Sequence, residues 1–139
     1  TESRLIENVV NTLEVFVRLS LQGIKLSIDD FGTGYSSQEK LKNLPFSELK
    51  IDHAFANNVH KDPHLQAIVA SNILMARNLG LETTVEGIET NEDWHYVCDL
   101  GCNIIQGYYI AKPMPLQELL QWMQRWNGVR QEAPPASAA

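Results

Sequence analysis

Three observations in the amino-acid sequence predict an α/β fold in which helices alternate with parallel strands. Four short segments have the character of strands, and the first of them, residues 24–29, has apolar residues at every second position, as expected of a strand with one buried face. Longer segments with apolar residues three or four positions apart separate them, as expected of amphipathic helices. Each strand-like segment also ends in a polar residue, so the strand ends are candidates for a functional site.

The spacing of these units predicts a more specific architecture. Successive strand ends lie roughly 20 to 34 residues apart, close to the roughly 30 residues per unit of an eight-fold βα barrel. Four units make half of a TIM (βα)8 barrel, and a half sheet left open would expose two unpaired edges. We therefore expect residues 1–128 to form the C-terminal half of such a barrel, with the other half upstream of Thr1.

Composition limits the classes of function. The 139 residues carry a formal net charge of −6 from 17 acidic and 11 basic side chains, which argues against a general binder of nucleic acid or membrane surfaces. No apolar segment approaches the roughly 18 residues of a membrane span, and no signal peptide is visible, so we expect a cytoplasmic protein. Residues 129–139, which are small and Pro-rich, are expected to form a disordered tail.

The first helix is predicted over residues 5–17 and the first strand over residues 24–29. The apolar side chains of this strand alternate with polar ones, so Asp29 points away from the packed face. Asp30 begins a glycine-rich loop. Two adjacent carboxylates repel each other unless a cation lies between them, so Mg²⁺ or Mn²⁺ is the natural partner. The competing interpretation is a solvated acidic turn with an N-cap role.

The remaining elements follow in order, each ended by a glycine, a proline or a turn. Helices are predicted over residues 38–44, 62–80, 90–101 and 116–126, the last ended by Gly128, and strands over residues 48–52, 81–86 and 103–106. Asp62 and Thr90 are the expected N-caps of the two long central helices, because both residue types accept hydrogen bonds from exposed backbone N–H groups.

Polar side chains therefore gather at the predicted C-terminal ends of all four strands. They are Asp29 and Asp30 at the first strand, Lys50 and Asp52 on one face of the second, Glu86 at the third, and Gln106 at the fourth. In βα barrels, catalytic groups project from this end of the strands. Each residue alone has an ordinary structural explanation, but together they predict a functional site.

Five segments carry a resemblance to a known family. They read Asp29-Asp30-Phe31-Gly32-Thr33-Gly34-Tyr35-Ser36-Ser37, Leu49-Lys50-Ile51-Asp52, Val85-Glu86-Gly87-Ile88-Glu89-Thr90, Gly101-Cys102, and Gln106-Gly107-Tyr108 with Pro113. In this order and at this spacing, the chain from residue 1 to about residue 126 closely resembles the C-terminal half of EAL-domain cyclic-di-GMP phosphodiesterases. The resemblance implies a modified (βα)8 barrel that hydrolyses cyclic di-GMP to linear pGpG with Mg²⁺ or Mn²⁺, two ions in a complete site.

The resemblance also implies roles for individual residues. Asp29, Asp30 and Glu86 resemble the metal ligands of the family, with Asp29 placed to bridge two ions. Glu86 is also similar to the glutamate proposed as general base, and Lys50 to the lysine that orients the attacking water and steadies the phosphate.

Further residues resemble the supporting and substrate-binding groups of the family. Glu89 would be a supporting carboxylate, Asp52 a second supporting group, and Gln106 a polar group on the substrate side of the barrel mouth. Glu2 resembles the last residue of a Glu-x-Thr-Glu motif that braces the loop over residues 30–37.

The sequence departs from the family pattern in ways that leave alternatives open. The Glu-Ala-Leu triplet that names the family is absent, as are two further metal ligands, and His53 replaces a frequent basic residue. The alternatives are a non-catalytic receptor for cyclic di-GMP or a partner protein, and a fragment that is inactive when isolated. The expected partners are cyclic di-GMP, the upstream half of the barrel, sensory or regulatory domains before it, and a second copy in a homodimer.

Overall fold

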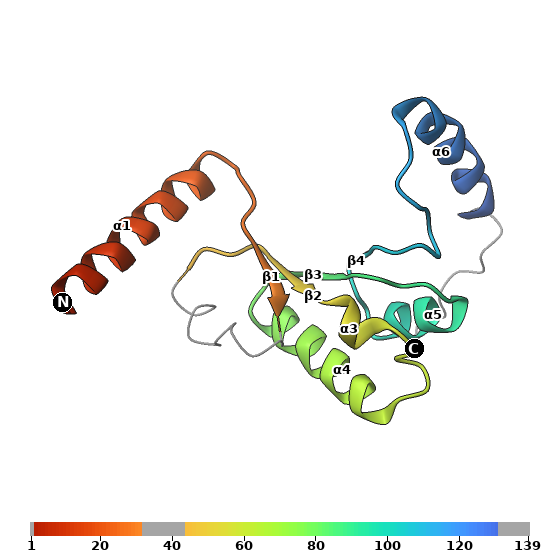
Figure 1. Ribbon diagram of the computed structural model, residues 1–139, viewed down its shortest axis with the longest axis horizontal. Helices are drawn as coiled ribbons and strands as arrows, with labels where there is room; N and C mark the ends of the chain where they lie inside the picture. Colours follow the sequence, from red (N-terminus) through yellow and green to blue (C-terminus); the bar gives the residue numbers. More distant parts are fainter. Residues whose placement is uncertain (1, 32–43, 131–139) are drawn as a thin grey trace.

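The computed structural model describes the backbone of residues 2–31 and 44–130, and the side chains of residues 12–29 and 44–126. The elements in chain order are α1 (Glu2–Leu21), β1 (Ser27–Phe31), β2 (Glu48–Ile51), α3 (His53–Ala56), α4 (Pro63–Asn78), β3 (Glu82–Val85), α5 (Asn91–Asp99), β4 (Ile104–Ile105) and α6 (Leu116–Arg130). Figure 1 shows the strands at the centre, with α1 and α6 toward opposite ends of the molecule. The alternation of helices and strands confirms the predicted α/β class.

The four strands form one parallel sheet in the order β1-β2-β3-β4. Each strand pairs with the next in sequence, as the strands of a βα barrel do. The register places Lys50 of β2 opposite Thr84 of β3, and Ile51 opposite Val85. Because all the strands run in the same direction, their C-terminal ends lie along one edge of the sheet, where the predicted residues Lys50, Glu86 and Gln106 are found.

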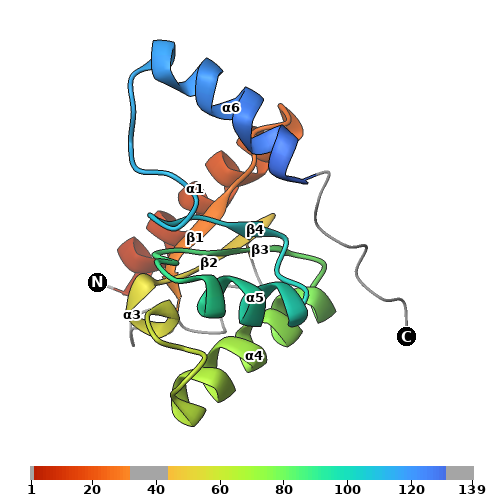
Figure 2. The same ribbon diagram turned by 90° about the vertical axis from the view of Figure 1, so that its right-hand side faces the viewer.

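Helices α4 and α5 pack against one face of this sheet, as Figure 2 shows. The two layers enclose one apolar cluster, which includes Leu49, Ile51, Val69, Ile73, Ala76, Val85 and Val97. Along β2 the buried Leu49 and Ile51 alternate with the half-buried Glu48 and Lys50, which confirms the predicted faces of this strand. Burial of these side chains provides the main driving force for the fold.

The helix boundaries follow the predicted capping residues. The Asp62 carboxylate accepts hydrogen bonds from the backbone N–H groups of His64 and Leu65, so it caps α4, whose first residue is Pro63. The Thr90 hydroxyl caps α5 in the same way. Among the helices of the described ranges, none is both long enough and apolar enough to cross a membrane.

The first strand differs from its prediction in a way that matters for the site. It begins at Ser27 and continues through Asp30 and Phe31, so the prediction that Asp30 begins the loop was wrong. Ile28 pairs with Leu49, and Phe31 pairs with Ile51. Between these two pairs, β1 has two residues, Asp29 and Asp30, whereas β2 has only Lys50. This is a β-bulge, and it is invisible to an argument based on strict alternation of side chains.

Two other boundaries differ from the sequence prediction. Helix α3 was not predicted, because its single turn is too short to show a helical period. Helix α6 continues to Arg130, four residues past the predicted end at Trp126, so Gly128 does not stop it. Residues 32–43, with the predicted glycine-rich loop and nearly all of the predicted helix over residues 38–44, and residues 131–139 lie outside the described part of the chain.

The segments that follow β3 and β4 approach each other closely at Gly107. The Ile88 N–H donates to the Gln106 carbonyl at 3.1 Å, and the Tyr109 N–H donates to the Ile88 carbonyl at 3.0 Å. A Cβ atom on Gly107 would lie 2.0 Å from the Ile88 carbonyl oxygen and 2.3 Å from its nitrogen. Only glycine therefore permits this contact, which fixes the segment after Glu86 against the segment after β4.

We expect Gly107→Ala to destabilise the protein by about 2–4 kcal/mol, because backbone atoms must move to admit the new methyl group. Gly80→Ala is the matched control: Gly80 has a φ of +72° but no atom within 4 Å of an added Cβ. Gly80→Ala should lower the free energy of unfolding by only about 1 kcal/mol, through conformational strain alone. Urea unfolding of the two variants measures the difference, and equal losses would contradict this role for Gly107.

Candidate functional site

Three charged side chains, from the middle of β1, from β2 and from the residue after β3, meet near the C-terminal edge of the sheet. The Lys50 ammonium donates a hydrogen bond to Asp29 Oδ1 at 3.2 Å and forms an ion pair with Glu86 Oε1. Figure 1 shows the three strands side by side. Three residues that are far apart in the sequence, and that were predicted to share a site, therefore lie in one cluster.

The sheet explains why these side chains converge. β2 lies between β1 and β3, so Lys50 can reach carboxylates from both neighbours. Glu86 directly follows β3, and its backbone N–H donates to the Ile51 carbonyl at 3.0 Å, which extends the pairing past the strand end. Asp29 lies in the bulge of β1, and bulges re-aim side chains relative to a regular strand.

The environment of the cluster is only partly solvated. The side chains of Lys50 and Glu86 are 25% and 21% exposed, whereas that of Asp29 is 66% exposed. The hydrogen bond to Glu86 raises the pKa of Lys50, burial opposes this rise, and the hydrogen bond to Asp29 adds to it. The net effect is a raised pKa, so Lys50 carries a full positive charge at neutral pH.

The cluster has the chemistry of a site for a divalent cation. Carboxylates from two strands already share one positive charge, the Lys50 ammonium, so the two oxygens converge on a position that favours a cation. Such oxygen donors are those that Mg²⁺ and Mn²⁺ prefer. Among the described side chains no group of three or more His, Cys, Asp or Glu could hold a metal ion, and the Asp30 side chain is not among them.

Asp52 contributes to the turn that follows Lys50. Its carboxylate accepts a hydrogen bond from the Ala54 N–H at 2.7 Å and lies 3.2 Å from His53 Nδ1, so it caps α3. Asp52 thus has a structural task at the end of β2, and its supporting role in the site stays a prediction.

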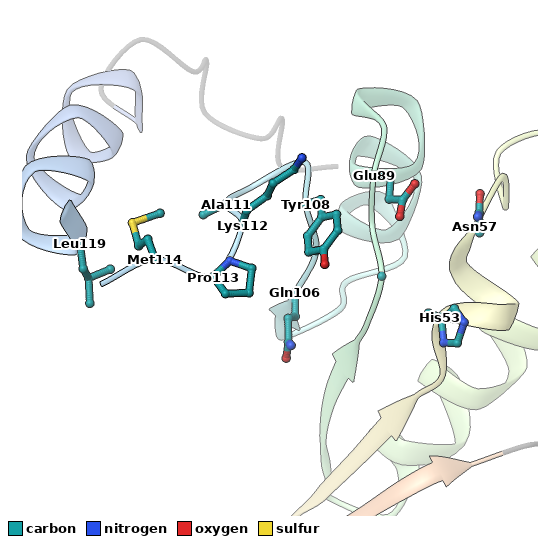
Figure 3. Close-up of a pocket in the computed structure, with 12 residues that line it drawn as sticks. His53, Asn57, Glu89, Gln106, Tyr108, Ala111, Lys112, Pro113, Met114 and Leu119 are labelled. Carbon is teal, nitrogen blue, oxygen red and sulfur yellow. The ribbon is translucent and has the colours of Figure 1, made fainter. Parts of the chain in front are cut away.

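A pocket of about 570 Å³ lies at the C-terminal ends of β3 and β4 (Figure 3). Its lining residues are His53, Asn57, Gly87, Glu89, Gln106, Gly107, Tyr108, Ala111, Lys112, Pro113, Met114 and Leu119. The predicted residues Glu89 and Gln106 are among them. Since Gly87 follows Glu86 directly, the pocket adjoins the charged cluster.

The pocket walls offer several kinds of contact to a ligand. Figure 3 shows His53 and Asn57 on the α3 side and Gln106, Tyr108 and Lys112 on the segment after β4. The Lys112 ammonium lies 5.5 Å from the centroid of the Tyr108 ring, a cation–π contact. The pocket is suited to a planar polar ligand that carries phosphate. Around it lie an aromatic ring, an amide, a carboxylate and a cation.

A buried carboxylate that the sequence analysis did not place in the site supports its outer wall. The Asp93 side chain is 1% exposed and accepts hydrogen bonds from the His60 N–H at 3.0 Å and the Thr90 hydroxyl at 2.7 Å. His60 Nδ1 lies 2.6 Å from the same carboxylate. Burial alone would raise the pKa of Asp93, but the hydrogen bonds from His60 and Thr90 outweigh it and lower the pKa.

This network joins the segment after α3 to the start of α5. It therefore fixes Thr90, and with it the segment that carries Glu86 and Glu89. The sequence did contain an indication of the contact between Thr90 and Asp93, because the two residues have the spacing of an N-terminal capping motif.

Several predicted site residues lie where the structure gives no side chains. Glu2 belongs to α1 and Asp30 and Phe31 to β1, but only their backbones are described. The predicted loop residues Gly32, Thr33, Gly34, Tyr35, Ser36 and Ser37 lie outside the described ranges. Their roles stay predictions.

Comparison with protein families gives a match over most of the chain. The sequence model of the EAL domain family matches residues 1–113. The cyclic di-GMP phosphodiesterase RocR of Pseudomonas aeruginosa is 41% identical over 122 residues, which are 88% of this chain and 31% of RocR. The chain thus spans less than a third of this relative.

Solved structures give the same fold. The PaMucR phosphodiesterase of Pseudomonas aeruginosa, solved with c-di-GMP, matches with a TM-score of 0.73 and 43% identity over 80% of this chain and 45% of that chain. The manganese and c-di-GMP complex of BlrP1 from Klebsiella pneumoniae matches with a TM-score of 0.66 and 35% identity. The match covers 72% of this chain and 26% of the BlrP1 chain. These likenesses confirm the predicted TIM-barrel-like fold, of which the described sheet is a four-stranded part.

We expect Asp93→Asn to lower the free energy of unfolding by about 2–4 kcal/mol at pH 7, because it removes a buried charge that His60 and Thr90 hydrogen-bond. The lowered pKa of Asp93 means that its contribution is present above the unfolded pKa, about 4, and is lost as the pH falls through the lower folded value.

Urea unfolding at pH 7 and at pH 3 measures both effects. The variant should differ less from the natural protein at pH 3 than at pH 7. Asp99→Asn, an exposed carboxylate on the same helix, is the control and should change stability by less than about 0.5 kcal/mol. A loss at Asp93 that is the same at both pH values would contradict the assignment.

Proposed function

Because the chain belongs to the EAL-domain family, we propose that it forms part of a phosphodiesterase that hydrolyses cyclic di-GMP to linear pGpG. The observation that carries this proposal is the meeting of Asp29, Lys50 and Glu86 at the C-terminal edge of the sheet. The name of the relative RocR, a cyclic di-GMP phosphodiesterase, supports the choice of substrate. The proposal concerns the whole protein that carries this chain.

In this proposal, Asp29, Asp30 and Glu86 hold the divalent cations, Mg²⁺ or Mn²⁺, two in a complete site. The manganese in the solved BlrP1 complex supports this choice of ion. When bound, such ions lower the pKa of a water molecule and neutralise charge that develops on the phosphate. The carboxylates supply the oxygen donors for this purpose.

The residues of the chain perform the remaining steps. A Glu86 carboxylate oxygen takes the proton of the attacking water as the water oxygen bonds to phosphorus. The bond from phosphorus to the 3′ oxygen breaks, that oxygen gains a proton, and the product keeps a 5′ phosphate. The Lys50 ammonium orients the water and stabilises the negative charge on the phosphoryl oxygens.

The pocket beside the cluster would hold the rest of the substrate. Gln106 offers a donor and an acceptor to a guanine base, and Glu89 offers a carboxylate to its N–H groups. Both residues lie on segments that backbone hydrogen bonds around Ile88 hold together, so their positions are fixed before substrate binds.

Four further expectations from the sequence analysis stay predictions. They are the upstream half of the barrel, a sensory or regulatory domain before it, a homodimer, and a cytoplasmic location.

Hydrolysis of cyclic di-GMP by the natural protein that carries this chain, with Mg²⁺ or Mn²⁺ present, tests the proposal. We expect turnover to pGpG, and Glu86→Gln should lower kcat by at least about a hundredfold, because it removes a metal-ligand charge and the general base. Glu82→Gln is the matched control, since Glu82 lies at the opposite end of β3 and pairs with Lys25 at the surface. Binding without turnover by the natural protein would instead support a receptor.

We expect Gln106→Ala to raise KM by about tenfold and to change kcat less, because Gln106 would contact the base rather than the reacting phosphate. Gln117→Ala, an exposed glutamine on the first turn of α6, should leave both constants unchanged. Steady-state kinetics of the two variants checks this, and an effect of Gln106→Ala confined to kcat would contradict the placement.

A further inference from the structure

The Lys50 ammonium occupies the position between the two carboxylates that the proposed function gives to the metal. It contacts Asp29 Oδ1 on one side and Glu86 Oε1 on the other. The side chains of Lys50 and Glu86 are both about three-quarters buried, so this is an ion pair with restricted access to water. Among the described side chains, Lys50 is the one cation that touches two carboxylates.

A divalent cation bound by the same two oxygens cannot share that position with an ammonium group. The metal ion and the ammonium group would lie within a few ångströms of each other, where two positive charges repel strongly. Metal binding must therefore move Lys50.

Lys50 has both the length and the surroundings to move. Its four-carbon side chain carries a compact charge that can take several positions. A lysine side chain is ordinarily charged at neutral pH, so it leaves the carboxylates as a cation. A nearby phosphate would be its next partner.

We propose that Lys50 is a resident counter-ion that the metal displaces, so that metal binding releases the ammonium from Asp29 and Glu86 and makes it available to the phosphate of the substrate. This inference rests on the proposed function, because it takes Asp29 and Glu86 as metal ligands. It adds an order of events: before metal binds, Lys50 neutralises the carboxylates, and afterwards it neutralises the phosphate. Lys50 therefore both weakens metal binding in the absence of substrate and couples it to substrate binding.

The affinity for Mn²⁺ alone, without substrate, tests this inference. Free Mn²⁺ is measured by electron paramagnetic resonance in titrations of the natural protein and its Lys50→Met variant. We expect Lys50→Met to bind Mn²⁺ at least about tenfold more tightly, because the competing ammonium is gone while its apolar stem is kept. Unchanged or weaker binding by Lys50→Met would overturn the inference.

Lys25→Met is the matched control. Lys25 Nζ lies 2.6 Å from Glu82 Oε2, so it forms the same kind of pair beside the same sheet, but at the opposite end of the strands. Its replacement removes one positive charge from the protein without touching the cluster, so it measures the effect of net charge alone. If Lys25→Met increased the affinity for Mn²⁺ as much as Lys50→Met does, the inference would be overturned.

A measurement on the natural protein keeps the test independent of whether Lys50→Met folds. The rate at which an amine-reactive reagent modifies Lys50 is followed by peptide mass spectrometry, with and without Mg²⁺. We expect Mg²⁺ to raise this rate at least about threefold, because the Lys50 side chain becomes more accessible once it leaves Asp29 and Glu86, while the rate at Lys25 stays constant. An unchanged or lower rate at Lys50 would overturn the inference.

Glu86→Gln separates failure of this inference from failure of the proposed function. If Glu86→Gln weakens Mn²⁺ binding but Lys50→Met does not strengthen it, the metal site stands and the displacement of Lys50 is wrong. If Glu86→Gln leaves Mn²⁺ binding unchanged, the metal site itself is wrong, and the inference is overturned with it.

Discussion

The parallel pairing of β1, β2 and β3 is the constraint on which the rest of the structure depends. Because neighbouring strands run in the same direction, their C-terminal ends form one edge, and residues separated by long helical segments meet there. Lys50 on the middle strand reaches carboxylates on both sides. A change in the register of β2 by one residue would turn Lys50 to the other face of the sheet, away from both carboxylates.

The segments beyond the strands are held by a close backbone contact and by a buried side chain. Gly107 lets the segment after β4 approach Ile88 closely, and the buried Asp93 fixes the start of α5. Both features lie outside the charged cluster, yet they position the residues around it. Rigid support of this kind is what a site needs to hold polar groups in a productive arrangement.

The sequence predicted the alternation of the four strands with the long helices α4, α5 and α6, the N-caps of α4 and α5, and the meeting of strand ends, because these depend on local periodicity and capping chemistry. The capping roles of Asp62 and Thr90 are examples. The bulge at Asp29 and Asp30 could not be predicted, since it depends on pairing with β2. The contact of Asp93 with His60 was also missed, because it joins residues from separate elements through tertiary packing.

The central claim is that the cluster of Asp29, Lys50 and Glu86 is the metal site of a phosphodiesterase. Crystals of the natural protein grown with Mn²⁺, and examined by anomalous diffraction, test it most directly. The account predicts an anomalous peak within about 2.3 Å of carboxylate oxygens of both Asp29 and Glu86. An anomalous peak against Glu89 in the neighbouring pocket, with Lys50 still paired to Asp29 and Glu86, would contradict it.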